Sequence, residues 1–342
     1  MSFPEFIEDE ATLDEIMTRP TEPVVELMRD LEGDILILGI NGKMGLSLGR
    51  LAVRAIEEAG VDKKVIGVSR FTDPAGREKL EDWGIETLKC DLLDIDSVAG
   101  LPQMPNIIFM AGRKFGTQGS PELTWAMNTL VPARVCDFFK SSRIVAFSTG
   151  NVYPFTPVES GGATEDVTPD PVGDYARSCL GREMMFTYYS HEIPVLLFRL
   201  NYAIDLRYGV LYDLAQKVLN GEVIDLAMGH VNILWQGDAN AQALRCLPLC
   251  ASPAKPLNIT GPETLSIRSL VTDLGRHLGS EPVFEGEEAK NALLNNSRQA
   301  TELFGPPSVD VEALVRWTAH WIKIGGAALN KPTHFEVRSG KF

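Results

Sequence analysis

The feature that most constrains the fold is a glycine-spaced turn between a short apolar run and a helical pattern. Residues 34–38 form the apolar run, Gly39, Gly42 and Gly45 follow it, and apolar positions recur with helical spacing over 43–59. In such a turn the first glycine permits a tight bend, the second lets backbone N–H groups approach a pyrophosphate, and the third lets the helix pack closely on the strand. The pattern predicts a dinucleotide-binding turn. A glycine-rich turn without a ligand is the alternative.

The composition excludes several classes of protein. The chain has 342 residues, of which 44% are hydrophobic, enough for one large α/β domain with a smaller lobe or for two domains. A net charge of −14 argues against a nucleic-acid partner, because phosphate backbones are bound by clustered Lys and Arg. The five cysteines are scattered without metal-ligand spacing, so we expect no metal site and a reducing, cytoplasmic compartment. Neither a signal peptide nor a membrane span is expected.

Predicted strands alternate with predicted helices as far as residue 200, which predicts an α/β fold with a doubly wound parallel sheet of Rossmann type. The predicted strands are 34–38, 64–69, 86–90, 106–110, 143–148 and 195–200, and the predicted helices are 43–59, 75–83, 95–101, 123–139 and 175–190. Later Gly- and Pro-containing breaks predict a smaller C-terminal lobe. The predicted division is an N-terminal arm, 1–32, ending in a short helix; a nucleotide-binding domain, 34–202, with a returning segment near 230–248; a substrate-binding lobe, 203–229 and 249–325; and a C-terminal tail, 326–342. The tail is expected to be a surface arm, and the alternative is that it folds back over a substrate.

Further motifs follow the glycine turn in a fixed order. An Asp-Leu pair follows the third predicted strand, a Ser/Thr segment ends the fifth, and a tyrosine opens the next helix. In this order the chain resembles the extended short-chain dehydrogenase/reductase family, the NAD(P)-dependent sugar epimerases, dehydratases and ketoreductases, over most of residues 34 to 325. The segments that carry the resemblance are Gly39-x-x-Gly42-x-x-Gly45, Cys90-Asp91-Leu92-Leu93-Asp94, Phe109-Met-Ala111-Gly112, Phe147-Ser148-Thr149-Gly-Asn-Val-Tyr153, Tyr175, Phe198-Arg199-Leu-Asn201 and Asn232-Ile-Leu-Trp235-Gln-Gly-Asp238.

The resemblance implies roles for individual residues. Thr149 would bond the substrate oxygen beside Tyr175, the proton donor or acceptor, and the predicted helices 123–139 and 175–190 would form a homodimer. Gly150 and Asn151 stand where dehydratases of the family carry an Asp-Glu pair, so simple 4,6-dehydration is not expected. The residues expected at the cofactor are Gly39, Asn41, Gly42, Lys43, Met44, Gly45, Ser69, Arg70, Asp91, Leu92, Ala111, Gly112 and Asn128, and those expected at the substrate are Arg113, Lys114, Asn151 and Asn201.

Three of these residues have a purely structural alternative. Thr149 would then bond the turn after its strand, and Tyr175 would pack on the preceding loop. Asn128 would hold a structural water or backbone near the site, or equally be an ordinary polar residue of a helix.

The residues after the second predicted strand bear on the choice of cofactor. An NAD enzyme places an acidic residue there against the ribose 2′-OH, whereas this chain has Ser69 and Arg70. A guanidinium can pair with a 2′-phosphate in a bidentate way, and Ser69 can add a hydroxyl. NADP is therefore expected in preference to NAD, unless Arg70 is simply a solvated residue at the end of a strand.

The chain departs from the family at the residue that assists the tyrosine. The family pairs Tyr with Lys at i and i+4 on one helix face, whereas here Cys179 follows Tyr175 at that interval. A cation ~4 Å from the phenol, at an effective dielectric of ~20, is worth on the order of 4 kcal/mol, or about three pKa units. Without it, Tyr175 should stay protonated and serve better as an acid than as a base, which favours reduction.

Other cations could compensate for the missing lysine. Arg113 and Lys114 follow the fourth predicted strand and should lie at the carboxyl edge of the sheet, although they can equally be an exposed basic pair. Arg177 points away from Tyr175 on the helix, and Arg182 lies on the same face but two turns on.

The sequence therefore favours a ketoreductase or epimerase acting on a sugar, sugar acid or sugar nucleotide. The alternative is an NADP-binding regulatory protein that has lost turnover. In a third hypothesis, Cys179 is a redox-sensitive thiol beside the cofactor.

Overall fold

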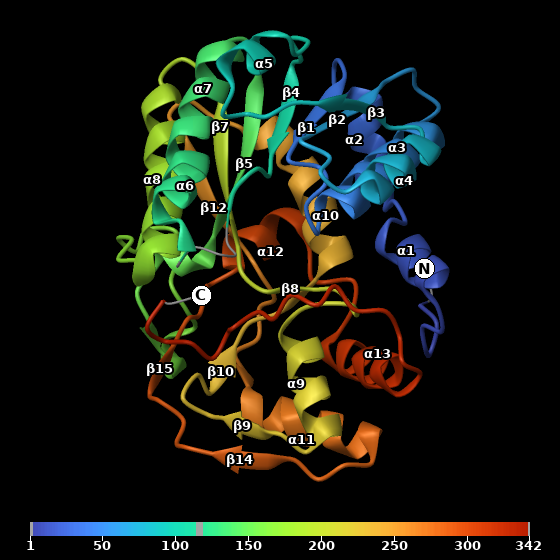
Figure 1. The fold of residues 1–342 in the computed structure, drawn as a ribbon, viewed down its shortest axis with the longest axis vertical. Coiled ribbons are helices and arrows are strands. Elements are labelled where there is room, and N and C mark those ends of the chain that lie inside the picture. Colours follow the sequence, from blue (N-terminus) through green and yellow to red (C-terminus); the bar gives the residue numbers. More distant parts are fainter. Residues whose placement is uncertain (1–2, 114–118, 341–342) are drawn as a thin grey trace.

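The computed structural model describes residues 3–113 and 119–340. These residues form a central seven-stranded sheet with the order β12-β7-β5-β4-β1-β2-β3, in which neighbouring strands are parallel (Figure 1). Its strands are β1 (Ile35–Leu38), β2 (Val65–Ser69), β3 (Glu86–Lys89), β4 (Asn106–Phe109), β5 (Arg143–Thr149), β7 (Val195–Leu200) and β12 (Lys255–Ile259). The predicted doubly wound parallel sheet is confirmed. It includes β12, which the sequence prediction assigned to the smaller lobe.

Both faces of the sheet are covered by helices, so its central strands are mostly apolar and buried. Along β1, Ile35 and Ile37 pack into one core and Leu36 and Leu38 into the other, because successive side chains of a strand point to opposite faces. The helices that contribute to the first core are α2 (Glu22–Asp30), α3 (Gly45–Ala59), α4 (Pro74–Asp82) and α10 (Gln236–Arg245). Those that contribute to the second are α5 (Ile95–Ala99), α7 (Val131–Phe138) and α8 (Gly173–Tyr189).

The helix predicted over 123–139 is present but changes its winding. It runs through α6 (Pro121–Trp125), a π-helical turn η2 (Ala126–Leu130) and α7. Such π turns are frequent at functional sites, because the extra residue per turn re-aims a side chain. Here the turn contains Asn128, which is completely buried and hydrogen-bonds to α8.

The sheet order has a switch point between β1 and β4. From β1 the chain continues to β2 on one side, and from β4 it continues to β5 on the other. Loops that leave the carboxyl ends of the two strands therefore diverge, which opens the crevice where ligands bind in doubly wound folds. The glycine turn leaves β1 at this edge, and residues 110–113 leave β4 there.

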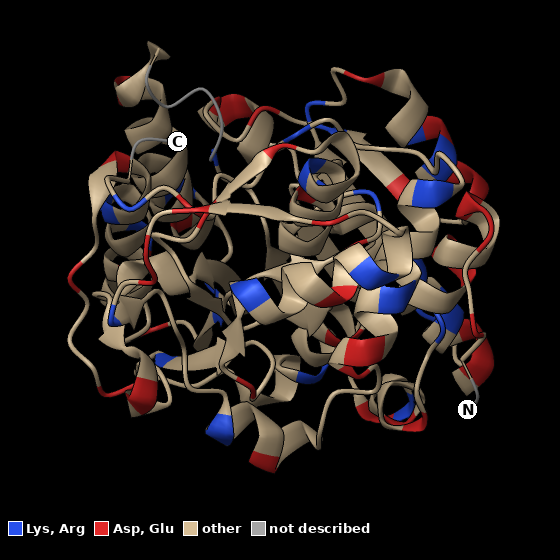
Figure 2. Cartoon of the chain, turned by 90° about the horizontal axis from the view of Figure 1, so that it is seen from below, with Lys and Arg blue, Asp and Glu red and all other residues tan. Residues whose placement is uncertain are grey.

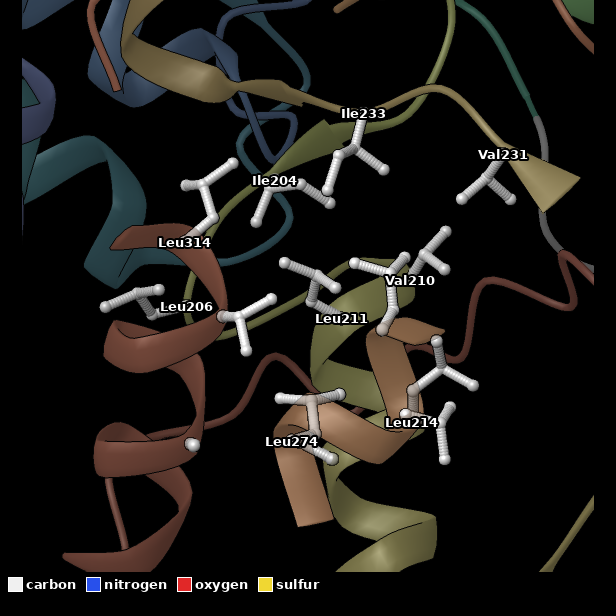
Figure 3. Close-up of a cluster of buried hydrophobic side chains, with 14 of the residues drawn as sticks. Ile204, Leu206, Val210, Leu211, Leu214, Val231, Ile233, Leu274 and Leu314 are labelled. Carbon is white, nitrogen blue, oxygen red and sulfur yellow. The ribbon is translucent and has the colours of Figure 1, made fainter. Parts of the chain in front are cut away.

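The smaller lobe has a hydrophobic core of its own below the sheet (Figure 1). Its main helices are α9 (Val210–Asn220), α11 (Ile267–Leu278) and α13 (Val311–Lys323). Figure 3 shows Leu211 and Leu214 of α9 gathered with Leu274 of α11 and Leu314 of α13. The remaining elements are α1 (Glu10–Met17), α12 (Arg298–Phe304), β6 (Thr156–Pro157), β8 (Ala203–Ile204), β9 (Val223–Asp225), β10 (His230–Val231), β11 (Leu234–Trp235), β13 (Leu265–Ser266), β14 (Val283–Glu285), β15 (Asn291–Ala292) and the 3₁₀ turns η3 (Gly150–Val152), η4 (Val158–Ser160) and η5 (Leu247–Leu249).

Substitution of Leu214 tests this core. Leu214 is 0% exposed, so Leu214→Ala removes buried methyl groups and leaves a cavity that the packed helices cannot close completely. We expect the free energy of unfolding to fall by about 2–5 kcal/mol, measured by urea denaturation. Leu219→Ala is the matched control, because Leu219 lies on the same helix and is 45% exposed. Equal losses for the two variants would contradict the assignment of Leu214 to the core.

The N-terminal segment packs on both parts of the molecule rather than extending from it. The short helix predicted at the end of the segment is α2, whereas α1 was not predicted. Arg54 of α3 donates to the Glu15 carbonyl at 2.8 Å, and the Trp317 indole of α13 donates to the Pro4 carbonyl at 3.1 Å. Figure 2 shows acidic residues gathered beside this terminus. The segment therefore ties the sheet domain to the lobe.

The C-terminal tail also packs against the molecule. Thr333 and Phe335 are each only 3% exposed, and Phe335 belongs to the core of the lobe. The expectation of a surface arm is wrong for this segment, because a buried phenylalanine anchors it. No helix in the described part of the chain is long and apolar enough to span a membrane.

Candidate functional site

A cavity of about 280 Å³ lies where the glycine turn, the end of β5, the start of α8 and the loop after β7 meet. It joins residues that the sequence analysis assigned to cofactor, catalysis and substrate. The predicted residues that line it are Gly39, Gly42, Lys43, Met44, Thr149, Asn151, Tyr175 and Asn201. Its walls are completed by Met110, Phe147, Ser148, Leu200, Tyr202, Ala203, Tyr208, Gly209, Val210, Gln236 and Thr333.

The three glycines of the turn are required for different reasons. Gly39 has φ +90°, and a β-carbon there would lie 2.7 Å from the Ala111 nitrogen. A β-carbon on Gly45 would lie 2.1 Å from the Ile40 carbonyl oxygen, so this glycine allows the helix to pack closely. Around Gly42 the nearest atom would be 3.3 Å away, and Gly42 lines the cavity. The turn therefore leaves open backbone toward the cavity at Gly42, which fits the approach of a phosphate group.

Tyr175 lines the cavity near the start of α8 and Thr149 lines it at the end of β5. The Tyr175 hydroxyl interacts with the side chains of Thr149 and Cys179. Burial raises the pKa of Tyr175 well above its usual range, and Cys179 acts in the same direction, whereas Arg182 and Thr149 act to lower it. The phenol is therefore protonated at neutral pH. Thr149 also donates to the Asn151 side-chain oxygen at 3.1 Å, within the turn that follows β5.

Arg182 lies on the same helix as Tyr175, and its positive charge acts to lower the pKa of the Tyr175 phenol. Its guanidinium is buried and donates to the Phe147 carbonyl at 2.9 Å and to the Asn128 side-chain oxygen. Asn128 in turn accepts from the Arg113 backbone nitrogen at 3.0 Å and donates to the Ser178 hydroxyl at 2.9 Å. These contacts clamp the loop after β4 to α8. Asn128 thus holds backbone near the site, as its structural alternative proposed.

A second buried network, of hydrogen bonds and an ion pair, holds the end of β5 in place. Glu183 accepts from the Ser148 hydroxyl at 2.5 Å and forms a paired contact with Arg199, whose Nη2 lies 2.7 Å from the carboxylate. Arg199 also donates to the Tyr153 hydroxyl at 2.6 Å, which donates to Asn258 at 2.9 Å. Because each of these charged atoms has a partner, the network can be buried without an isolated charge. It fixes Ser148 immediately before Thr149.

Cys179 occupies the position of the missing lysine and lies outside the cavity. Its side chain is completely buried among Val152, Tyr153 and Ala163, and it interacts with the Tyr175 hydroxyl. A neutral thiol cannot lower the phenol pKa as a lysine would. The basic group of the cavity wall is Lys43 of the glycine turn, and its ammonium lies 3.0 Å from the centroid of the Tyr208 ring.

Asn201 lines the cavity at the end of β7. Its side-chain nitrogen is buried and has no hydrogen-bond partner among the described residues. A buried amide donor without a partner costs on the order of 1–3 kcal/mol. Such an atom beside a cavity fits the role of a ligand-binding group.

The other predicted residues that the structure describes do not line the cavity. Arg70 is exposed at the end of β2, Asp91 accepts from the Leu93 backbone nitrogen at 3.0 Å, and Leu92 is buried in the second core. Lys114 falls outside the described residues. The remaining predicted residues of this group are Asn41, Gly45, Ser69, Ala111, Gly112, Arg113, Asn128 and Cys179, and their assigned roles stay predictions.

The sequence analysis missed several residues of the site. Tyr208 and Val210 line the cavity from the lobe, Gln236 lines it from α10 beside the sheet, and Thr333 reaches it from the tail. Gln236 stood in a recognised motif, but its contact with the Ser47 hydroxyl, at 3.1 Å, depends on the packing of α10 against α3. Thr333 gave no local signal at all. Among the described residues no group of His, Cys, Asp and Glu converges to hold a metal ion.

Solved structures with the same fold are sugar-nucleotide enzymes. A UDP-glucuronic acid 4-epimerase mutant from Bacillus cereus, in complex with a fluorinated UDP-sugar and NAD, matches 85% of this chain and 99% of its own, with 17% identity and a TM-score of 0.70. A dTDP-glucose 4,6-dehydratase from Bacillus anthracis, in complex with NAD, matches 85% and 96% with 17% identity and a TM-score of 0.70. A UDP-galactose 4-epimerase matches 85% and 98% with 19% identity and a TM-score of 0.66.

No protein-family model matches the chain, and no curated protein sequence does. The structural matches establish the fold, which is the one that the resemblance to the extended short-chain dehydrogenases implied. About 15% of the chain has no counterpart in them, since each match covers 85% of it.

Proposed function

We propose that the chain is a nicotinamide-dinucleotide-dependent oxidoreductase of the extended short-chain dehydrogenase/reductase family, acting as a ketoreductase or epimerase on a carbohydrate. The observation that carries the proposal is the single cavity that joins the open backbone at Gly42 to Thr149 and Tyr175. A dinucleotide held along the glycine turn supplies hydride chemistry at its nicotinamide C4. The fold of the matched epimerases and dehydratase supports the same class.

In the proposed reaction, side chains of the protein supply the proton that the substrate oxygen takes up. Tyr175 donates from its hydroxyl to a substrate carbonyl oxygen, and Thr149 orients that oxygen through its own hydroxyl. The raised pKa of Tyr175 supports the role of acid, so reduction is the favoured direction. In the absence of the lysine, Arg182 of α8 supplies a positive charge that acts on the Tyr175 phenol. The hydrogen bonds of Glu183 keep the end of β5 in place.

The proposal is tested by binding and by a single turnover. We expect the purified protein to quench or shift NADPH fluorescence with saturable binding. We then expect it to oxidise the bound NADPH when mixed with a panel of free keto sugars, free uronic acids and UDP-keto-sugars, each of which offers a carbonyl group that can accept the hydride. Absence of saturable binding of either NADPH or NADH would overturn the proposal.

The preference for NADP rests on Arg70 and has its own test. Arg70→Glu replaces a guanidinium that can pair with the 2′-phosphate by a carboxylate that repels it. We expect NADPH affinity to fall by roughly 10- to 100-fold, while NADH affinity stays unchanged, in a fluorescence titration. Arg298→Glu, on exposed α12, is the matched control. A wild-type protein that binds NADH more tightly than NADPH would contradict the Arg70 argument.

A second function is supported by Cys179. A protein that keeps the cofactor cradle and lacks the lysine can serve as an NADP-dependent regulator. Tight NADPH binding without hydride transfer to any member of the panel, and without a gain on Cys179→Lys, would favour the regulator. Hydride transfer by the wild-type protein would exclude it.

The remaining expectations also stay proposals. A homodimer through α6, α7 and α8 is supported by exposed apolar side chains on two of these helices. Those side chains are Leu123, Trp125, Met184 and Tyr188. A cytoplasmic location stays a prediction from the scattered cysteines, which form no disulfide among the described residues.

A further inference from the structure

The C-terminal tail, residues 327–340, is fastened first to the lobe. The Asp213 carboxylate of α9 accepts from both the backbone nitrogen and the hydroxyl of Thr333, at 2.7 and 2.5 Å. Lys217, one turn further along α9, lies 3.5 Å from the Glu336 carboxylate. Phe335, between these contacts, inserts into the core of the lobe. The tail thus follows one helix of the lobe and presents Thr333 to the cavity.

The tail then crosses to the sheet domain. Arg338 donates to the carbonyls of Ala227 and Asn291 and stacks over the Phe155 ring, at 4.2 Å from its centroid. A β-carbon on Gly173 would lie 2.2 Å from the Gly340 carbonyl oxygen, so the end of the tail touches the start of α8. Figure 1 shows the tail in dark red running between the sheet above and the lobe below. Gly173 lies two residues before Tyr175 in the chain, so the end of the described tail is close to the start of the helix that carries Tyr175.

Two hollows border the tail beside the main cavity. The one between the loop after β5 and the lobe measures about 30 Å³, room for little more than a water molecule, and Phe335, Val337 and Arg338 of the tail form much of its wall. The other, which Tyr208 separates from the main cavity and which the tail lines with Lys331 and His334, measures about 250 Å³. The main cavity of about 280 Å³ must hold the reactive end of the dinucleotide as well as the substrate. Sites for single drug-sized ligands are already ~300–1,000 Å³.

The shortage of basic residues in the main cavity also argues against binding of a second diphosphate beside that of the dinucleotide. Among the described lining residues Lys43 is the only basic one, and it belongs to the glycine turn that would hold the dinucleotide. Diphosphates are commonly held by arginine forks. The Arg338 guanidinium is already engaged with two carbonyls and with the Asn291 side chain.

We infer that the tail restricts the substrate to a compact carbohydrate, such as a free keto sugar or a uronic acid, and excludes nucleoside-diphosphate sugars. The inference rests on the proposed function and narrows its substrate class. Asp213 is a positioning residue in this arrangement, because it acts on the substrate through the Thr333 segment. The matched epimerases and dehydratase act on sugars joined to UDP or dTDP, so the tail distinguishes this chain within a shared fold.

The experiment measures how tightly large ligands bind when the tail is fastened to the lobe and when it is not. Each protein is first saturated with NADP⁺, and UDP-glucose and UDP-glucuronic acid are then titrated by calorimetry. The variants are Asp213→Ala and a chain that ends at Leu329, and the control is Asp273→Ala, an exposed aspartate of the same lobe that pairs with Arg276. The Asp213 variant keeps the buried Phe335 and so remains informative if the shortened chain does not fold. NADPH affinity is measured for every protein.

We expect both tail variants to bind the UDP-sugars at least about tenfold more tightly than the wild-type and control proteins, with NADPH affinity unchanged. In single turnovers we expect the wild-type protein to oxidise NADPH with a free keto sugar or uronic acid. Equal UDP-sugar affinity in all the proteins, or turnover of a UDP-sugar by the wild-type chain, would overturn the inference and leave the proposed function standing. Failure of every protein to bind a nicotinamide dinucleotide would instead overturn the proposed function.

Discussion

Replacement of Tyr175 by phenylalanine should lower kcat for the proposed reduction by about 10²- to 10⁴-fold, while NADPH affinity stays unchanged. The reason is that Tyr175 lines the cavity beside Thr149 and carries the hydroxyl that would donate the proton, whereas the glycine turn holds the dinucleotide. Tyr188→Phe is the matched control, because Tyr188 lies on the same helix and is 70% exposed. The measurement is single-turnover oxidation of NADPH with the best substrate of the panel. Equal rates for Tyr175→Phe and the control would remove Tyr175 from the mechanism.

The pH dependence of the wild-type rate tests the same assignment. The pKa of Tyr175 is raised, so the acid form needed for reduction persists above the usual phenol pKa of about 10. The reductive rate should therefore show no decline from loss of this proton between about pH 6 and about pH 9. Cys179→Lys places a cation next to the phenol and should move its pKa down, so that the decline begins at lower pH. An unchanged profile in a folded Cys179→Lys variant would show that the phenol does not control the rate.

Replacement of Glu183 by alanine should lower the free energy of unfolding by about 3–5 kcal/mol. This substitution leaves the Arg199 guanidinium buried without its carboxylate and removes the acceptor of the Ser148 hydroxyl. The matched control is Glu302→Ala, which breaks the exposed pair with Arg298 and should cost at most about 1 kcal/mol. Urea denaturation of both variants measures the difference.

The Glu183 substitution should also reduce activity, because Ser148 precedes Thr149 in β5. We expect kcat to fall more than KM changes, since the cavity keeps its lining residues while the hydroxyl of Thr149 loses its fixed position. A loss of stability no larger than that of Glu302→Ala would contradict the buried network. Unchanged kcat in a folded Glu183→Ala variant would separate the network from the site.

The parts of the fold that follow from local pattern were predictable. The apolar runs became six of the seven strands of the sheet, and the glycine turn lies between β1 and α3 as expected. β12 was placed in the lobe because Lys255 and Pro256 interrupt its short apolar run, and its identity as a strand comes from pairing with β7. Pairing between distant segments leaves little trace in either one.

The chemistry of the site was predictable only in part. Thr149 and Tyr175 were found because the segments that contain them resemble motifs of the extended short-chain dehydrogenase/reductase family, and the structure brings them to one cavity. Arg182 was judged too far along the helix from Tyr175, yet its buried guanidinium acts on the phenol, since charges inside a protein are poorly screened. The role of the π turn in aiming Asn128 at Arg182 has no signature in the sequence.

The sequence by itself determined six of the seven strands of the sheet, the glycine turn and the absence of a lysine four residues after Tyr175, because each depends on periodicity or on spacings of a few residues. Only the tertiary structure decided what closes the cavity. Lys43 meets Tyr208, and Thr333 meets Asp213, across separations in the chain that no local pattern spans. Such contacts form when the hydrophobic cores of the sheet and the lobe bring their loops together, so their geometry is a consequence of the whole fold.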